Sequence, residues 1–288
     1  MMHLLYIHWR INPVIFKLGF LSLRYYSILF TGGILFSYIF LHRLFKTENI
    51  TDELFGKLAI YIIIGTVAGA RLGHCLFYEP AYFLSHPLEI ILPWQGMPWT
   101  KNFIFTGYQG LASHGAALGI FIGAYLFSRR YDTPLLWLLD RLCLAVPIAG
   151  GMVRLGNLMN SEIIGKPSHV PWAFIFERVD MIPRHPSQIY EALLYFSLFV
   201  ILKIIYKKVK DGRKNGLVFG WFLLILFLMR FFIEFFKADQ EPFEKHLPFD
   251  MGQLLSIPCI LIGFWLIYLK GRGPRDTTQN IIDRPESY

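Results

Sequence analysis

Long apolar runs alternate with short polar segments along most of this chain. Runs of about 20 residues, the length of helix that crosses the hydrocarbon core of a bilayer, recur about seven times. They lie at about 22–42, 56–77, 111–128, 134–153, 187–206, 216–235 and 252–270. The pattern predicts an all-α, polytopic membrane protein with about seven transmembrane helices in one integral membrane domain, residues 1–288.

The composition agrees with this class. The mean hydropathy is +0.45, 55% of the residues are hydrophobic and 17% are charged, values unlike those of a soluble domain. The cysteines, Cys75, Cys143 and Cys259, lie within or at the edges of apolar runs and have neither pairing nor metal-ligand spacing. They are interpreted as buried apolar side chains, and no metal site is expected.

Lysine and arginine are distributed unevenly between the two sets of connections. If the N-terminus is outside, the inner connections and the C-terminal tail are rich in them: Arg43, Lys46, Lys57, Arg129, Arg130, Lys207, Lys208, Lys210, Arg213, Lys214, Lys270, Arg272, Arg275 and Arg284. The outer connections are longer and hold fewer. The positive-inside rule therefore predicts an outside N-terminus and a cytoplasmic C-terminus. The net charge of +8 then reflects topology and attraction to anionic membrane lipid, with no nucleic acid as partner.

One short pattern, Arg-Leu-Gly-x5-Glu, occurs twice at the ends of apolar runs, from Arg71 to Glu79 and from Arg154 to Glu162. An arginine at the edge of hydrocarbon costs a few kcal/mol unless an anion pairs with it. The repeat therefore indicates a binding site for an anion. Two structural salt bridges are the alternative.

The predicted topology places four unusual polar side chains near the outer ends of spans, at one depth: Arg71, His114, Arg154 and Arg230. Because the positive-inside rule depletes this side of cations, membrane insertion does not explain the arginines, whereas an anionic ligand in the outer leaflet does. A phospholipid phosphate, which arginine binds bidentately, is the obvious candidate. By contrast, the adjacent Asp140 and Arg141 lie toward the cytoplasmic side and are predicted to form a local or interhelical pair.

Two long outer connections differ in character. The first, about 78–110, contains prolines and tryptophans: Pro80, Pro87, Pro93, Pro98, Trp94 and Trp99. These residues argue against a long helix and favour a segment that lies in the membrane interface. The second, about 155–186, is irregular and polar, and it is longer than a minimal connector. A loop of this length is usually functional, and a solvated loop is the alternative.

Several stretches occur in the order found in one enzyme family. They are Asn12–Gly19, Leu23–Tyr26, Gly69–Gly73, Gly110–Gly115, Arg154–Glu162 with Gly165, Arg184–Glu191 and Arg230–Glu234. Together they resemble the phosphatidylglycerol–prolipoprotein diacylglyceryl transferases over most of the chain. The chain departs from the family pattern at four positions. It has Val153, Ala116 and Ser27 where the family usually has Gly, and Leu158 where the family usually has Phe. None of them removes a polar or ionisable group, so they affect backbone geometry and packing more than chemistry.

The resemblance implies a seven-span enzyme of the bacterial plasma (inner) membrane that acts outside the cytoplasm. Members of the family move the diacylglyceryl group from phosphatidylglycerol to the thiol of the lipobox cysteine in the signal peptide of prolipoproteins. They form a thioether and release glycerol phosphate, which is the first step of bacterial lipoprotein maturation. The implied partners are phosphatidylglycerol, the prolipoprotein and membrane lipid, with no metal or other cofactor.

The resemblance also implies catalytic residues. His114 matches the family's essential histidine, and an unperturbed histidine pKa of about 6.5 suits a base that takes the thiol proton. A histidine that orients a hydroxyl or a phosphate is the alternative. Arg154 and Arg230 match the key arginines, which would hold the phosphate and stabilise charge on the leaving group. Their alternative is structural pairing with Glu162 and Glu234, and both roles can hold together.

Substrate-binding residues are implied in the same way: Tyr26, Arg71, Asn157, Asn160, Glu162, Gly165 and Glu234. The polar ones are interpreted as partners of phosphate, glycerol or backbone. Tyr26 can instead be an interfacial anchor, and Arg71 can instead pair with Glu79.

A transporter or flippase for an anionic lipid or solute is the alternative class. Such proteins usually place ionisable residues near the midplane, between inverted repeats with broken helices. Here the ionisable residues are predicted at one face, and the repeated Arg-Leu-Gly joins two spans of the same direction. An intramembrane metalloprotease is disfavoured because the chain has no His-Glu-x-x-His motif.

Overall fold

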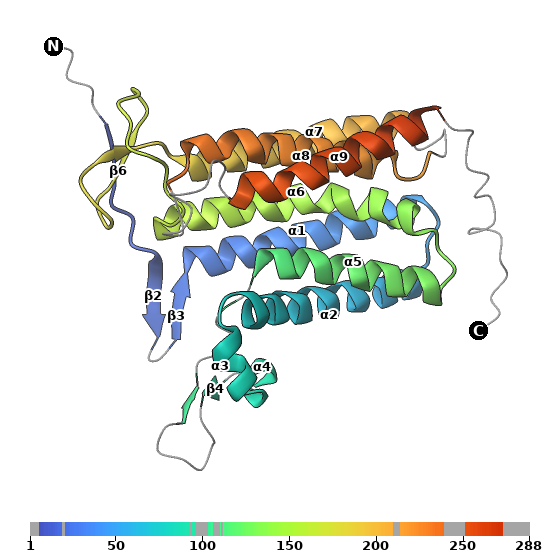
Figure 1. Ribbon diagram of the computed structural model, residues 1–288, viewed down its shortest axis with the longest axis horizontal. Coiled ribbons are helices and arrows are strands. Elements are labelled where there is room, and N and C mark those ends of the chain that lie inside the picture. Colours follow the sequence, from blue (N-terminus) through green and yellow to red (C-terminus); the bar gives the residue numbers. More distant parts are fainter. Residues whose placement is uncertain are drawn as a thin grey trace. The chain divides into compact units, whose positions relative to one another are not determined.

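Helices dominate the computed structural model, which describes residues 6–18, 21–92, 94–95, 103–105, 110, 112–209, 214–238 and 251–272. The long ones are α1 (Tyr25–Thr47), α2 (Asp52–Phe77), α5 (Ser113–Arg130), α6 (Leu135–Asn160), α7 (Ser187–Val209), α8 (Leu217–Ile233) and α9 (Met251–Arg272) (Figure 1). Some residues used in the sequence-based predictions lie outside the described part: Gly19, Pro93, Pro98, Trp99, Leu111, Lys210, Arg213, Arg275 and Arg284.

Within the described residues, six helices are long and apolar enough to cross a membrane. They are Tyr25–Thr47, Asp52–Phe77, Leu135–Asn160, Ser187–Val209, Leu217–Phe236 and Gly252–Gly271. The predicted class, an all-α polytopic membrane protein, is confirmed. The span predicted at 111–128 forms helix α5, but this helix is not among the six, because it begins with Ser-His-Gly and ends with two arginines.

Helix α6 continues well beyond the predicted end at residue 153 and stops at Asn160. The buried Leu158 extends the apolar side of the helix past that point. The chain then leaves the helix through left-handed backbone at Ser161 and Ile163, with φ values of 58° and 52°. Two polar residues assigned to the loop, Asn157 and Asn160, therefore lie on the helix together with Arg154.

The contacts divide the chain into two compact units, and each is described by itself. Unit 1 comprises Met1–Leu44 and Leu139–Tyr288, and unit 2 comprises Phe45–Leu138. The single domain expected over 1–288 stays a prediction.

Unit 2 is built on an antiparallel pair of helices, α2 and α5, that meet through glycines. Three glycines from each helix, spaced four residues apart, form the contact: Gly65, Gly69, Gly73, Gly115, Gly119 and Gly123. A Cβ atom on Gly119 would lie 1.9 Å from the carbonyl oxygen of Gly65, and one on Gly69 would lie 2.3 Å from that of Gly115. The two backbones therefore touch, as in close-packed membrane helices with small residues at the interface.

We expect Gly119→Ala to destabilise the protein by about 1–3 kcal/mol, because the added methyl group forces the two helices apart. Gly56→Ala is the matched control, since Gly56 lies in α2, the other helix of the pair, and a Cβ added there would meet nothing within 4 Å. That variant should be neutral or slightly stabilised, because alanine favours a helix more than glycine does. Thermal unfolding of the purified variants in one detergent makes the comparison. Equal stability of the two variants would contradict the close approach of α2 and α5.

The segment that follows α2 contains two short helices, α3 (Pro80–Ser85) and α4 (Leu88–Ile91), and two paired strands, β4 (Trp94–Gln95) and β5 (Ile104–Phe105). The described part of 78–110 thus has no long helix, as predicted. The hydroxyl of Tyr82 donates to Oε2 of Glu89 at 2.6 Å, and this bond raises the pKa of Tyr82 to about 12. It holds the two short helices against each other.

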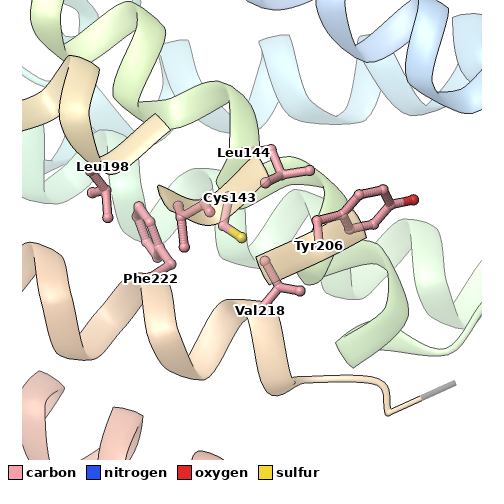
Figure 2. Packing of buried hydrophobic residues seen from close by; sticks show 7 residues of the cluster. Cys143, Leu144, Leu198, Tyr206, Val218 and Phe222 are labelled. Atoms are coloured by element: carbon pink, nitrogen blue, oxygen red, sulfur yellow. The ribbon is translucent and has the colours of Figure 1, made fainter. Parts of the chain in front are cut away.

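Unit 1 has its core between α6, α7 and α8, and Figure 2 shows the side chains of these helices converging. The buried members are Cys143, Leu144, Leu198, Leu202, Tyr206, Val218 and Phe222. Phe40 and Leu44 of α1 pack against this cluster. Glycines let aromatic rings reach α6, because a Cβ on Gly151 would lie 2.6 Å from the Phe196 ring.

Asp140 links α6 to α8 within this core. Its two carboxylate oxygens each accept one backbone N–H bond of 2.7 Å, from Gly216 and Phe219, at the start of α8. A carboxylate at a helix N-terminus satisfies amide groups that have no partner within the helix. The link is interhelical, and its partner is the backbone of α8, while the predicted pairing of Asp140 with Arg141 stays a prediction. Arg141 instead lies over the Tyr206 ring, 5.6 Å from its centre.

Short strands surround the end of unit 1 where α6 stops and α7 begins. Strand β6 (Phe174–Phe176) pairs in parallel with β1 (Ile7–Trp9) and antiparallel with β7 (Pro183–Arg184). Strands β2 (Val14–Leu18) and β3 (Leu21–Arg24) form a hairpin that leads directly into α1. The connection 155–186 is therefore more regular than predicted. Its β6 buries Phe174 and Phe176 against Leu158.

Candidate active site

Arg154 lies in a buried ion pair near the end of α6. Its Nε is 2.9 Å from Oε2 of Glu191 on α7, and its Nη1 makes a long contact of 3.4 Å with Oδ1 of Asn157. The side chains of Arg154 and Glu191 are 14% and 5% exposed. The alternative pairing with Glu162 is wrong. Glu162 lies beyond the end of α6 and accepts hydrogen bonds from asparagine side chains, whereas Nε of Arg154 faces Glu191.

Glu162 binds asparagine side chains instead. Its Oε2 accepts a bond of 3.0 Å from Nδ2 of Asn157, and its Oε1 accepts one of 3.1 Å from Nδ2 of Asn160. Asn157 therefore stands between Arg154 and Glu162. The glutamate acts on the arginine through this amide rather than by direct pairing.

Tyr26, at the start of α1, packs on the glycine of the Arg-Leu-Gly motif. A Cβ on Gly156 would lie 2.8 Å from Cδ2 of the Tyr26 ring, so the absence of a side chain makes room for the phenol. The structure thus brings Tyr26 to the polar end of α6.

Lys237 is a buried cation that the sequence analysis missed. Its Nζ is 3.0 Å and 3.2 Å from the two carboxylate oxygens of Glu234, and 3.8 Å from Oε1 of Glu191. The Lys237 side chain is 4% exposed. Glu191 therefore lies between two cations, Arg154 and Lys237. The spacing of three residues from Glu234 to Lys237 on one helical face was the available signal.

Arg230, on the last turn of α8, has no ion pair or hydrogen bond to any described residue. The alternative pairing with Glu234 is wrong, since that carboxylate binds Lys237. Arg230 lines a pocket between α7 and α8. The other lining residues are one carboxylate, Glu191, and five mainly apolar side chains: Leu194, Tyr195, Leu226, Met229 and Ile233. A guanidinium without a described carboxylate partner thus lies at a mainly apolar pocket.

Gly165 lies where two backbone segments cross beside this site. Its N–H donates to the His185 carbonyl at 3.0 Å, and it forms an antiparallel bridge with Lys237. A Cβ here would lie 2.4 Å from the His185 carbonyl oxygen and 2.8 Å from that of Phe236. The crossing needs glycine, and it fixes the segment that carries Lys237.

Charged pairs secure the strands around the site. Arg10 and His8, near β1, hydrogen-bond Glu177, and these bonds lower the pKa of the Glu177 carboxyl. The hydrogen bond from Arg184 likewise lowers the pKa of Asp180. Because these carboxylates are ionised at neutral pH, both pairs are formed under ordinary conditions.

Arg71 and His114 belong to unit 2. Arg71 donates to the carbonyl oxygens of Glu89 at 2.6 Å and Ile90 at 3.0 Å, and its guanidinium lies 4.8 Å from the centre of the Phe83 ring. No ion pair with Glu79 occurs among the described contacts, so that alternative is wrong. A cation at the carbonyl end of a short helix is favourable, and here it anchors α4 to α2.

His114 is the second residue of α5, and its side chain is exposed. The antiparallel register, in which Gly115 lies between Gly69 and Gly73, places His114 level with Arg71. Unit 2 therefore brings these two predicted site residues to one end of its helix pair. Unit 1 collects the rest: Tyr26, Arg154, Asn157, Asn160, Glu162, Gly165, Arg230 and Glu234.

The fold and the site together define an integral membrane protein with a buried cationic site beside an apolar pocket. This chain belongs to the prolipoprotein diacylglyceryl transferase family, whose family model matches residues 13–269. The resemblance in the motifs is thereby confirmed.

Curated relatives carry the name phosphatidylglycerol–prolipoprotein diacylglyceryl transferase. A protein from Bacteroides fragilis is 45% identical over 269 residues, which cover 93% of this chain and 97% of the relative. One from Chloroherpeton thalassium is 45% identical over 264 residues, covering 91% and 94%. One from Tolumonas auensis is 40% identical over 265 residues, covering 92% and 97%. These similarities over nearly whole chains favour an enzyme over the transporter class.

Proposed function

We propose that this protein transfers the diacylglyceryl group of phosphatidylglycerol to prolipoproteins and that Arg230 is its principal phosphate-binding cation. The observation that carries the proposal is the uncompensated guanidinium of Arg230 in a pocket lined mainly by apolar residues. A phospholipid presents the matching chemistry, with an anionic phosphate next to hydrocarbon.

The charges of the buried site support a single bound phosphodiester. Arg154 pairs with Glu191, and Lys237 pairs with Glu234, so each of these couples is neutral. Arg230 then supplies the charge that a phosphodiester neutralises. Arg154 contributes the guanidinium nitrogens that do not face Glu191, and Asn157, Asn160 and Tyr26 are assigned to phosphate or glycerol oxygens. Glu162 holds the two asparagines in place.

The reaction follows from these groups. The thiolate sulfur of the prolipoprotein cysteine attacks the glyceryl carbon that bears the phosphate ester. A carbon–sulfur bond forms, the carbon–oxygen bond breaks, and glycerol phosphate leaves with the electron pair. Guanidinium groups that already hold the phosphate stabilise the charge on the leaving oxygen without reorganising. The thiol proton must go to a base, because a thiol of pKa about 8.5 is mostly protonated at neutral pH, and His114 is assigned that role.

The proposed location is the bacterial inner membrane, with the site at the extracytoplasmic face and the lipobox cysteine of the signal peptide as acceptor. Its support is the excess of lysine and arginine in the connections assigned to the cytoplasm.

Topology gives a direct prediction. Reporter fusions in the connection at 207–214 and in the tail after Lys270 should both report a cytoplasmic location, because these segments carry the strongest clusters of basic residues. A fusion in the connection 155–186 should report the outside. If either basic segment is found outside, the assigned face of the active site is wrong as well.

The transfer itself is tested by mass spectrometry of a lipobox peptide incubated with the purified protein and phosphatidylglycerol. A mass increase of one diacylglyceryl group on the cysteine, with release of glycerol phosphate, is the expected product. A peptide with serine in place of the cysteine is the control and should stay unmodified. No adduct on the cysteine peptide, with protein that retains its fold, would overturn the proposed function.

A further inference from the structure

A row of alternating charges crosses unit 1, and Arg230 is left out of it. The row runs Arg154, Glu191, Lys237, Glu234, with ionic contacts of 2.9, 3.8 and 3.0 Å. Yet Glu234 is four residues beyond Arg230, the spacing at which an acid and a base on a helix meet. Something therefore keeps this carboxylate away from its nearest cation in the sequence.

The surroundings of Glu234 show what holds it. Both of its carboxylate oxygens accept bonds from the Lys237 ammonium, at 3.2 and 3.0 Å. On another side it lies against Gly252 of α9, where a Cβ would be 2.8 Å from Oε1. The residue is 7% exposed. Its carboxylate is thus committed to Lys237.

Lys237 is itself fixed by its backbone. Its N–H donates to the Glu234 carbonyl at 3.2 Å, it bridges Gly165, and the next N–H, of Ala238, donates to the Ile164 carbonyl at 3.1 Å. The connection after α6 therefore sets the position of the ammonium. A buried lysine whose Nζ contacts two carboxylates keeps both of them oriented.

We infer that Lys237 is a positioning residue. It holds the Glu234 carboxylate away from Arg230, so that the Arg230 guanidinium stays unpaired and can bind the phosphate of the lipid. The same ammonium contacts Oε1 of Glu191, which leaves Oε2 toward Arg154. Lys237 thereby sets the partners of both arginines without lining the pocket that Arg230 faces. The inference rests on the proposed function, since it assigns the Arg230 charge to phosphatidylglycerol.

The test begins with Lys237→Met, which keeps the length of the side chain and removes its charge. The carboxylate of Glu234 then has Arg230 as its nearest cation in the helix, and their pairing competes with the phosphate. We expect KM for phosphatidylglycerol to rise by about tenfold or more, with kcat at saturating lipid within about threefold of wild type. A variant that merely loosened the fold would lower kcat and the fraction of active protein instead.

The double variant Lys237→Met, Glu234→Gln removes the competing carboxylate as well. It leaves no unpaired charge of this couple in the interior, so it folds even if the single variant does not. We expect its KM for phosphatidylglycerol to return to within about threefold of wild type, because Arg230 is again unpaired. Lys214→Met is the matched control, because the Lys214 ammonium donates to the Gly271 carbonyl and pairs with no carboxylate among the described residues. Its KM should be unchanged.

Binding of phosphatidylglycerol without acceptor peptide is measured alongside, together with the thermal stability of each variant. A wild-type KM for Lys237→Met, or a double variant whose KM stays raised about tenfold, would overturn the inference while the transferase activity of the wild type stands. If the wild-type protein neither binds phosphatidylglycerol nor modifies the peptide, the proposed function fails instead. The two failures are therefore distinguishable.

Discussion

Arg230→Lys should lower kcat/KM for diacylglyceryl transfer by roughly 10²–10³, although the charge is kept. Within the site, Arg230 has no ion pair or hydrogen bond to a described residue, and the planar fork of arginine can hold two phosphate oxygens at once. The lysine ammonium is a point charge on a flexible chain and cannot reproduce that geometry. Stabilisation of the leaving oxygen is lost with it.

Arg154→Lys should show a loss of the same order for a second reason. Nε of Arg154 pairs with Glu191, and its Nη1 faces Asn157, so one guanidinium has different nitrogens for different partners. A lysine can keep the pair with Glu191 but has no second nitrogen for the lipid. The stability of this variant should therefore change less than its activity.

Single-turnover transfer to a lipobox peptide, followed by mass spectrometry, makes both measurements. Arg178→Lys is the matched control: this exposed arginine follows β6 in unit 1 and should tolerate the change. Normal turnover of both Arg154→Lys and Arg230→Lys would show that charge alone is sufficient. That result would contradict bidentate binding of the phosphate.

The helices were predictable because a membrane span must be both long and apolar, and both properties are local. The end of α6 was not, because the polar residues of its last two turns resemble a loop in a hydropathy pattern. Their partners lie on other elements: Glu191 on α7 for Arg154, and the Trp9 indole N–H, which donates to the Leu158 carbonyl at 3.0 Å. Contacts of this kind cannot be read from local sequence.

The α2–α5 contact had a visible signal that went unused. Glycines at every fourth position in both segments, at 65, 69 and 73 and at 115, 119 and 123, are the pattern of closely packed membrane helices. A search for apolar runs gives no weight to this spacing, and α5, with its polar start and two terminal arginines, is not among the six apolar spans. The pattern predicts which helices touch, which a hydropathy profile does not.

The ion-pair partners within the site were predicted poorly because spacing along a helix favours several partners equally. The spacing of Arg230, Glu234 and Lys237 permits Glu234 to bind either cation. The choice of Lys237 depends on the crossing at Gly165, whose backbone bridge is formed by residues far apart in the sequence. The types of residue at the site were readable from the sequence, whereas the pairing between them required the fold.

The pH dependence of His114→Gln should tell whether His114 is the base. If it accepts the thiol proton in the rate-limiting step, the variant should be severely impaired near neutral pH, by about 10²–10⁴. The loss should shrink as the pH rises toward the thiol pKa of about 8.5, because the thiol then ionises without help. The loss of activity must shrink, not grow, with rising pH, because a base is no longer needed once the thiol has lost its proton.

An orienting histidine predicts a different profile, because hydroxide does not replace a missing hydrogen bond. The loss would then be nearly constant with pH. The measurement is the ratio of wild-type to His114→Gln rates between about pH 6 and 9, which brackets the ordinary histidine and cysteine pKa values. Single-turnover kinetics separates binding from chemistry. The control is His86→Gln, at an exposed histidine. Its ratio of wild-type to variant rates should be near unity over the whole pH range. A flat ratio for His114→Gln would refute the role of His114 as the base and leave the transferase assignment untouched, since the proposed phosphate site consists of other residues.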